Sequence, residues 1–91
     1  MRIDKFLKNS RLIKRRTIAK EACDKERVHI NDRPAKAGAE VKSGDIVVIR
    51  FGNSELKVRV VELIESPKKE DAVKMYEVIE QKQRKEDVSE Q

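Results

Sequence analysis

Residues 13–31, IKRRTIAKEACDKERVHIN, predict a short helix that leads into a short strand. Small and apolar residues recur on one face of the helix, at Ile18, Ala19, Ala22 and Cys23. Because this spacing matches the period of an amphipathic helix, we expect the helix to run from about Arg15 to Lys25. The residues VHI, at 28–30, then predict a strand that shares the same core.

Another short helix is predicted before this one, from about Arg2 to Asn9. Its apolar residues follow the i, i+3, i+4 spacing: Ile3, Phe6 and Leu7. The basic residues of both helices lie beside or opposite the apolar faces: Arg2 and Lys5 on the first helix, Arg16, Lys20 and Arg27 on the second. Each helix is therefore expected to have a core side and a basic side.

The middle of the chain predicts a small antiparallel sheet. Asn31 and Asp32 are expected to form a hairpin turn, because both residue types tolerate a positive φ. Pro34-Ala35-Lys36 would begin the return strand. Residues 46–51, IVVIRF, and residues 55–63, ELKVRVVEL, predict two further strands separated by a Gly-Asn pair.

The segment after the sheet predicts a C-terminal helix. Ser66 and Pro67 match an N-cap and a first helical position, and four residues then repeat at helical spacing: Ala72, Met75, Tyr76 and Ile79. The run MYEVIE, residues 75–80, is also compatible with a strand. The expected fold class is α+β, with two N-terminal helices packed on a small, mainly antiparallel sheet and a C-terminal helix. We expect one domain over residues 1–80 and a polar, flexible tail over residues 81–91.

Positive charge is concentrated at the N-terminus. The first twenty residues hold eight Lys or Arg and one acid, a net charge of +7 in a chain whose total is +5. A sprinkling of charge for solubility would be more even, so this polarity predicts that the N-terminal helices meet an anion.

The inventory of reactive residues does not favour an enzyme. His29 alternates with apolar residues in a predicted strand and has no cysteine at metal-ligand spacing, and the single cysteine, Cys23, sits among small core residues. No Gly-rich phosphate loop is present. We therefore expect no catalytic residue, cofactor or metal site. Since no apolar run is long enough for a signal peptide or a membrane span, we expect a soluble cytoplasmic protein without a membrane partner.

Arg and Lys at helical spacing favour a nucleic acid as the anion, since each can neutralise a phosphate. The chain has no Trp, one Tyr and two Phe, so it offers no aromatic platform for single-stranded bases, and a folded RNA is expected. A DNA-reading helix pair would need Asn or Gln on its outer face, which the second helix lacks. A DNA-binding regulator and a module for an acidic protein partner remain alternatives.

Three motifs give this pattern a family resemblance: R-x-D-K-F-L from Arg2, K-R-R-x-x-A-K from Lys14, and R-V-x-I-N from Arg27. Together they resemble the S-four RNA-binding domain, or αL motif, over about residues 1–50. The resemblance implies RNA contacts at Arg2, Lys5, Arg11, Lys14, Arg15, Arg16, Lys20 and Arg27. It implies core positions at Phe6, Leu7, Ile18, Ala22, Val28 and Ile30. Asp4 belongs to the pattern and is expected to orient a basic side chain or to cap the helix.

Two positions depart from this family pattern. Glu26 stands where such domains often have glycine, and Asp32 stands where glycine often closes the hairpin. A residue other than glycine in a left-handed conformation costs about 1 kcal/mol, so the turns are expected to differ while the basic helices stay unchanged.

A longer resemblance, to about residue 80, is to freestanding S-four proteins of bacterial ribosome-associated quality control. It implies binding to the large ribosomal subunit that carries a stalled peptidyl-tRNA, with contacts to both rRNA and tRNA. It also implies support for template-free alanine tailing by the partner protein RqcH. The related heat-shock S-four protein suggests recycling of large subunits as the alternative task. We expect the chain to be a monomer.

Overall fold

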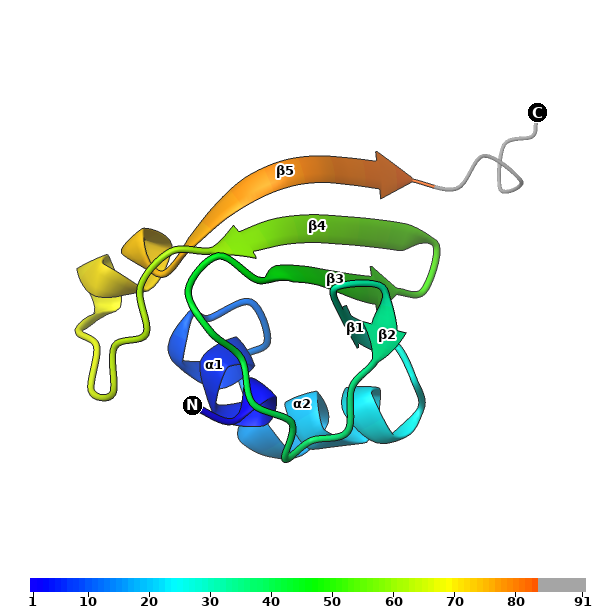
Figure 1. Cartoon of the computed structure of the whole chain (residues 1–91), viewed down its shortest axis with the longest axis horizontal. Coiled ribbons are helices and arrows are strands. Elements are labelled where there is room, and N and C mark those ends of the chain that lie inside the picture. Colours follow the sequence, from blue (N-terminus) through cyan, green and yellow to red (C-terminus); the bar gives the residue numbers. More distant parts are fainter. Residues whose placement is uncertain (84–91) are drawn as a thin grey trace.

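The computed structural model describes residues 1–83 and places two helices on one side of a five-stranded antiparallel sheet (Figure 1). The elements follow in chain order: α1 (Ile3–Asn9), α2 (Arg16–Asp24), β1 (Val28–Ile30), β2 (Arg33–Pro34), β3 (Ile46–Phe51), β4 (Ser54–Val60), the 3₁₀ helix η1 (Lys69–Lys74) and β5 (Tyr76–Gln83). The strands lie in the order β2-β1-β3-β4-β5. This arrangement confirms the predicted α+β class.

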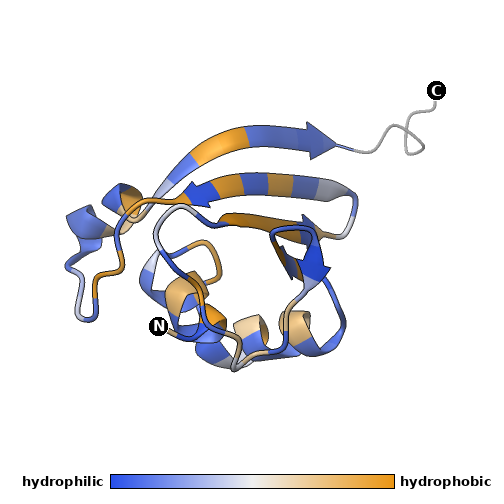
Figure 2. Ribbon diagram, in the orientation of Figure 1, coloured by the Kyte–Doolittle hydropathy of each residue, from blue (hydrophilic) through white to orange (hydrophobic). Residues whose placement is uncertain are grey.

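The core lies between the helix pair and one face of the sheet. Helix α1 contributes three fully buried side chains: Ile3, Phe6 and Leu7. The two central strands alternate along their length, as the hydropathy colours of β4 show in Figure 2, and they bury Val47, Ile49, Val58 and Val60. Because side chains alternate across a strand, the intervening residues lie on the other face, where Val48 and Lys57 are partly buried and Arg59 is exposed.

Left-handed residues end α2 and form the first hairpin. Glu26 has φ 59°, its N–H donates to the Cys23 carbonyl at 2.9 Å, and the next N–H reaches Ala22 at 2.9 Å. This pair of bonds defines a Schellman motif with glutamate at the position that glycine prefers. The predicted hairpin turn is confirmed, since Asn31 and Asp32 both have positive φ, 50° and 71°.

Asn31 also ties this turn to the start of β3. Its side-chain amide donates to the Asp45 carboxylate at 3.1 Å, and its side-chain oxygen accepts from the Ile46 N–H at 3.0 Å. These bonds offset the strain of a turn without glycine.

The predicted C-terminal helix is wrong. Residues 69–74 form only the short helix η1, and residues 76–83 form β5, as the strand alternative for MYEVIE anticipated. Residues 76–83 form a strand because they pair with the edge of β4, from Val60↔Tyr76 to Ser54↔Gln83. This pairing satisfies the backbone hydrogen-bonding groups along that edge. A helix face would instead need Ile79 in the core, whereas its side chain is 43% exposed.

Other boundaries and core positions differ in detail. Ile18, predicted to be core, is 49% exposed, since Ala19 and Cys23 are the α2 residues that point inward. Phe6, Leu7 and Val28 are buried as predicted, whereas Ala22 and Ile30 are partly buried against the core. The first return strand is Arg33–Pro34, one residue earlier than expected and shorter. Residues 81–83 of the predicted tail continue β5, and residues 84–91 lie outside the described residues.

Candidate RNA-binding site

Asp4 pairs with two arginines, one just before α1 and one at the start of α2. It lies in the first turn of α1 and is only 2% exposed. Arg2 donates from Nε to one carboxylate oxygen and from Nη2 to the other, both at 3.2 Å. Arg16, at the start of α2, approaches the same carboxylate with Nε at 3.4 Å and Nη2 at 3.5 Å. The expectation that Asp4 orients basic side chains is therefore confirmed.

Both arginines keep a free outer side. The side chains of Arg2 and Arg16 are 51% and 47% exposed, and a guanidinium has more N–H donors than one carboxylate can accept. Lys20 follows Arg16 by one helical turn and is exposed. A cleft of about 320 Å³ lies among these side chains and is lined by Arg2, Asp4, Arg16, Thr17 and Lys20. We call it the Asp4 cleft, and its outward N–H groups can bind a phosphate.

The packing of α2 holds the basic residues in this position. Ala19 and Cys23 are fully buried, which turns Arg16 and Lys20 toward solvent. Burial raises the pKa of the Cys23 thiol to about 11, and the negative charges of Asp4 and Asp24 add to the effect. The thiol is therefore protonated at neutral pH, which argues against a nucleophilic role.

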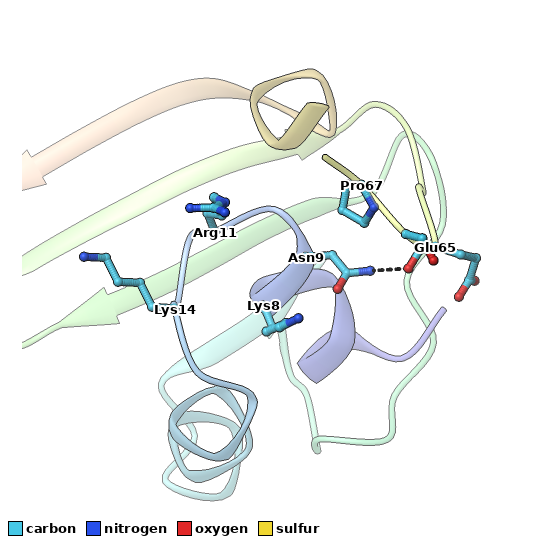
Figure 3. Close-up of a pocket in the computed structure, with 7 residues that line it drawn as sticks. Lys8, Asn9, Arg11, Lys14, Glu65 and Pro67 are labelled. Atoms are coloured by element: carbon cyan, nitrogen blue, oxygen red, sulfur yellow. Dashed lines mark hydrogen bonds between the residues drawn. The ribbon is translucent and has the colours of Figure 1, made fainter. Parts of the chain in front are cut away.

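A second group of basic residues lies at the other end of α1. Lys8, Arg11 and Lys14 line a cleft of about 440 Å³ together with Asn9 and residues 65–67 (Figure 3). We call it the Lys8 cleft. Asn9 links the end of α1 to the opposite wall of the cleft, because its side-chain amide donates to the carbonyls of Ile64 and Glu65, both at 3.1 Å.

Five of the eight predicted RNA-contacting residues line one of the two clefts, and three line neither. Arg2, Arg16 and Lys20 meet at the Asp4 cleft, and Arg11 and Lys14 meet at the Lys8 cleft. Lys5 instead pairs with Glu65, and its hydrogen bond and charge lower the pKa of that carboxyl. Arg15 and Arg27 are exposed at either end of α2 and line neither cleft.

Sequence reasoning missed Lys8 and Thr17 as lining residues. Lys8 is the last basic residue of α1, and the turn that follows the helix brings it to the same cleft as Arg11, a placement that helical spacing does not give. Thr17 carries no charge and gave no indication. Within residues 1–83, no three His, Cys, Asp or Glu side chains gather as a metal site would require. In the same part of the chain, no helix has the length and apolar character to cross a membrane.

The N-terminal half of the chain matches a known family model. The S4 domain model matches residues 1–47, which include both helices, the first hairpin and the start of β3. The chain therefore belongs to the S4 domain family, and the resemblance of its basic motifs is confirmed.

Curated relatives define a narrower group within that family. The RQC P-site tRNA stabilizing factor of Streptococcus pneumoniae is 52% identical over 97% of this chain and 100% of its own length. The protein of that name from Bacillus subtilis is 52% identical over 89% of this chain and 94% of its own.

The heat-shock branch of the family is also similar. The Heat shock protein 15 homolog of Haemophilus influenzae is 35% identical over 69% of this chain and 48% of its own length. The structure of Vibrio cholerae Heat Shock Protein 15, described as trimeric, superposes with a TM-score of 0.80 at 25% identity and covers 87% of this chain and 81% of that one.

Proposed function

We propose that this protein is an RNA-binding factor of ribosome-associated quality control. It binds the large ribosomal subunit that carries a stalled peptidyl-tRNA, contacts rRNA and tRNA, and supports alanine tailing of the nascent chain by RqcH. The observation that carries the proposal is the pair of arginines held by one buried carboxylate, since it presents fixed donors to phosphates. The names of the relatives, which specify a P-site tRNA, support the choice of ribosomal ligand.

The proposed role is positional and not catalytic. Phosphate contacts fix the place and orientation of a bound protein without reading sequence. A small body with basic side chains set on two packed helices suits this task, because the packing keeps each charge at a defined place. The protein would hold tRNA geometry while another factor performs the chemistry.

Sedimentation tests this function. The full chain is expected to cosediment with free large subunits. Affinity purification of complexes that contain the chain is expected to recover RqcH together with alanine-tailed peptidyl-tRNA. Consistent absence of both RqcH and alanine tails from complexes that do contain the large subunit would contradict the quality-control role.

A second candidate function is recycling of large subunits after heat shock. It is favoured by the likeness to the Haemophilus and Vibrio heat-shock proteins. Both candidate functions share the ribosomal ligand, so detection of alanine tails on the nascent chain separates them.

Two alternatives involve a different ligand. Duplex DNA binding as tight as binding to large subunits at equal salt would favour a DNA-binding regulator. A complex between this protein and its partner that survives nuclease treatment would favour an acidic protein partner.

A further inference from the structure

Lys5 has a partner of a kind that no other predicted RNA-contacting residue has. Its ammonium donates to the carboxylate of Glu65, which lies sixty residues further along the chain and beyond the S4 match. Within residues 1–83, Arg2 and Arg16 pair only with Asp4, which lies inside the match, and the other five form no ion pair. The segment that follows the S4 match therefore supplies an acid to one basic residue of the S4 helices.

Hydrogen bonds hold Glu65 beside helix α1. The Asn9 side-chain amide donates to the carbonyls of Ile64 and Glu65, both at 3.1 Å, as Figure 3 shows for Glu65. Asn9 follows Lys5 by four residues, so the two lie on the same face of α1. Since the backbone of Glu65 is fixed about one helical turn from Lys5, the ion pair forms with little further loss of chain entropy.

The carboxylate of Glu65 acts on Lys5 and not on the Lys8 cleft. In Figure 3 its side chain points away from Lys8, Arg11 and Lys14, although the residue lines that cleft. The hydrogen bond and the charge of Lys5 lower the pKa of the Glu65 carboxyl, so the carboxylate stays ionised at neutral pH. Among the described residues, Lys5 is therefore the basic residue whose charge Glu65 neutralises directly.

The pair is exposed, unlike the pairs that Asp4 makes. The side chains of Lys5 and Glu65 are 35% and 68% exposed, whereas Asp4 is buried. Water and salt screen an exposed ion pair, so this one contributes little to the stability of the fold. A phosphate can therefore displace Glu65 into solvent without disturbing the helix pair.

Displacement is harder for an RNA that binds by charge alone. Such an RNA must bring a phosphate to Lys5 against a carboxylate that is already there. An RNA positioned by the fixed arginines of the Asp4 cleft presents its phosphates at a high effective concentration, so it displaces Glu65 more readily. We propose that Glu65 is a specificity-determining residue, which withholds Lys5 from RNA that does not fit the S4 helices. This inference rests on the proposed function.

Binding to two kinds of RNA tests the inference. Glu65→Gln is expected to raise affinity for a duplex RNA of unrelated sequence about threefold and to steepen the slope of log K against log salt by about one, since Lys5 becomes free to neutralise a phosphate. Affinity for large subunits is expected to change by less than about twofold, because the positioned RNA displaces Glu65 in the native chain as well.

Glu62→Gln is the matched control. It removes the same charge from an exposed residue of the same segment, and Glu62 has no ion pair within residues 1–83. Equal gains in affinity for duplex RNA in Glu65→Gln and Glu62→Gln would overturn the inference. A gain for large subunits as great as the gain for duplex RNA would overturn it too.

The Lys5→Gln background shows whether Glu65 acts through its lysine. There, Glu65→Gln should raise affinity for duplex RNA no more than Glu62→Gln does, because no ammonium remains to be released. A gain specific to Glu65→Gln that persists in this background would overturn the inference. A native chain that binds duplex RNA but not large subunits would contradict the proposed function and the inference with it, whereas the other adverse outcomes contradict the inference alone.

Discussion

Arg16 reaches Asp4 across the helix pair: its Nε lies 3.4 Å from a carboxylate oxygen of Asp4, although twelve residues separate the two in sequence. The contact joins the first turn of α1 to the first residue of α2. It therefore fixes the helix pair and the direction of the arginine at the same time.

The Asp4→Asn substitution separates orientation from net charge. It raises the net charge by one, yet we expect weaker binding to large subunits, because the amide no longer holds the guanidinium groups of Arg2 and Arg16. We also expect the free energy of unfolding to fall by about 1 to 3 kcal/mol. Asp24→Asn is the control, since Asp24 is exposed on α2 and its replacement adds the same charge. Binding by Asp4→Asn as tight as by Asp24→Asn would show that charge alone matters.

The salt dependence of binding reports individual phosphate contacts. Arg16→Ala is expected to weaken binding to large subunits and to lower the slope of log K against log salt by about one. Lys20→Ala should act in the same way without disturbing the Asp4 pair, because Lys20 has no ion pair among residues 1–83. Lys82→Ala, on β5, should leave the slope unchanged. Similar losses of affinity and of salt slope in Arg16→Ala, Lys20→Ala and Lys82→Ala would indicate nonspecific electrostatic attraction.

Cys23 gives the protein an alkaline limit. The folded state holds the thiol proton more tightly than the unfolded state, since burial raises the pKa from 9.0 to about 11. The free energy of unfolding should therefore lose about 3 kcal/mol as pH rises through that window. Denaturant titrations of the native protein and of Cys23→Ala should differ in their pH dependence only above about pH 9. Parallel curves throughout would count against the shift.

The end of α2 offers a stabilising substitution. Glu26→Gly should raise the free energy of unfolding by about 1 kcal/mol, because Glu26 has φ 59° in a Schellman motif. Lys25→Gly, one residue earlier at φ −90°, should instead be neutral or destabilising. Thermal melts of the two variants provide the comparison, and a lower melting temperature for Glu26→Gly would refute the assignment of strain.

The parts of the fold that were predictable are those with local determinants. The two helices, the Asn31-Asp32 turn and β3 follow from periodicity and turn chemistry that a few neighbouring residues supply. The C-terminal segment was not predictable in this way, because residues 72–79 show helical spacing, residues 75–80 are also compatible with a strand, and pairing with the edge of β4 decides between them.

The candidate site shows the same division. Spacing alone indicated that Arg16 and Lys20 share a face, and the family pattern indicated the role of Asp4. The opposite wall of the Lys8 cleft depends on the hydrogen bonds of Asn9 to Ile64 and Glu65, contacts between positions more than fifty residues apart. The expected monomeric state stays a prediction. The Vibrio protein is described as trimeric, and hydrophobic periodicity in a sequence does not distinguish a surface that contacts other subunits from one that faces solvent.

The family match ends at Val47, which is the second residue of β3. A fragment cut at that point would lose Ile49, the partner of Val28, and the strands that supply Val58 and Val60. Ile3, Phe6 and Leu7 would then be covered by the first hairpin without most of β3 and without β4. We therefore expect the matched residues 1–47 not to fold alone, so that grafting them onto another protein would transfer the charges without the scaffold that spaces them.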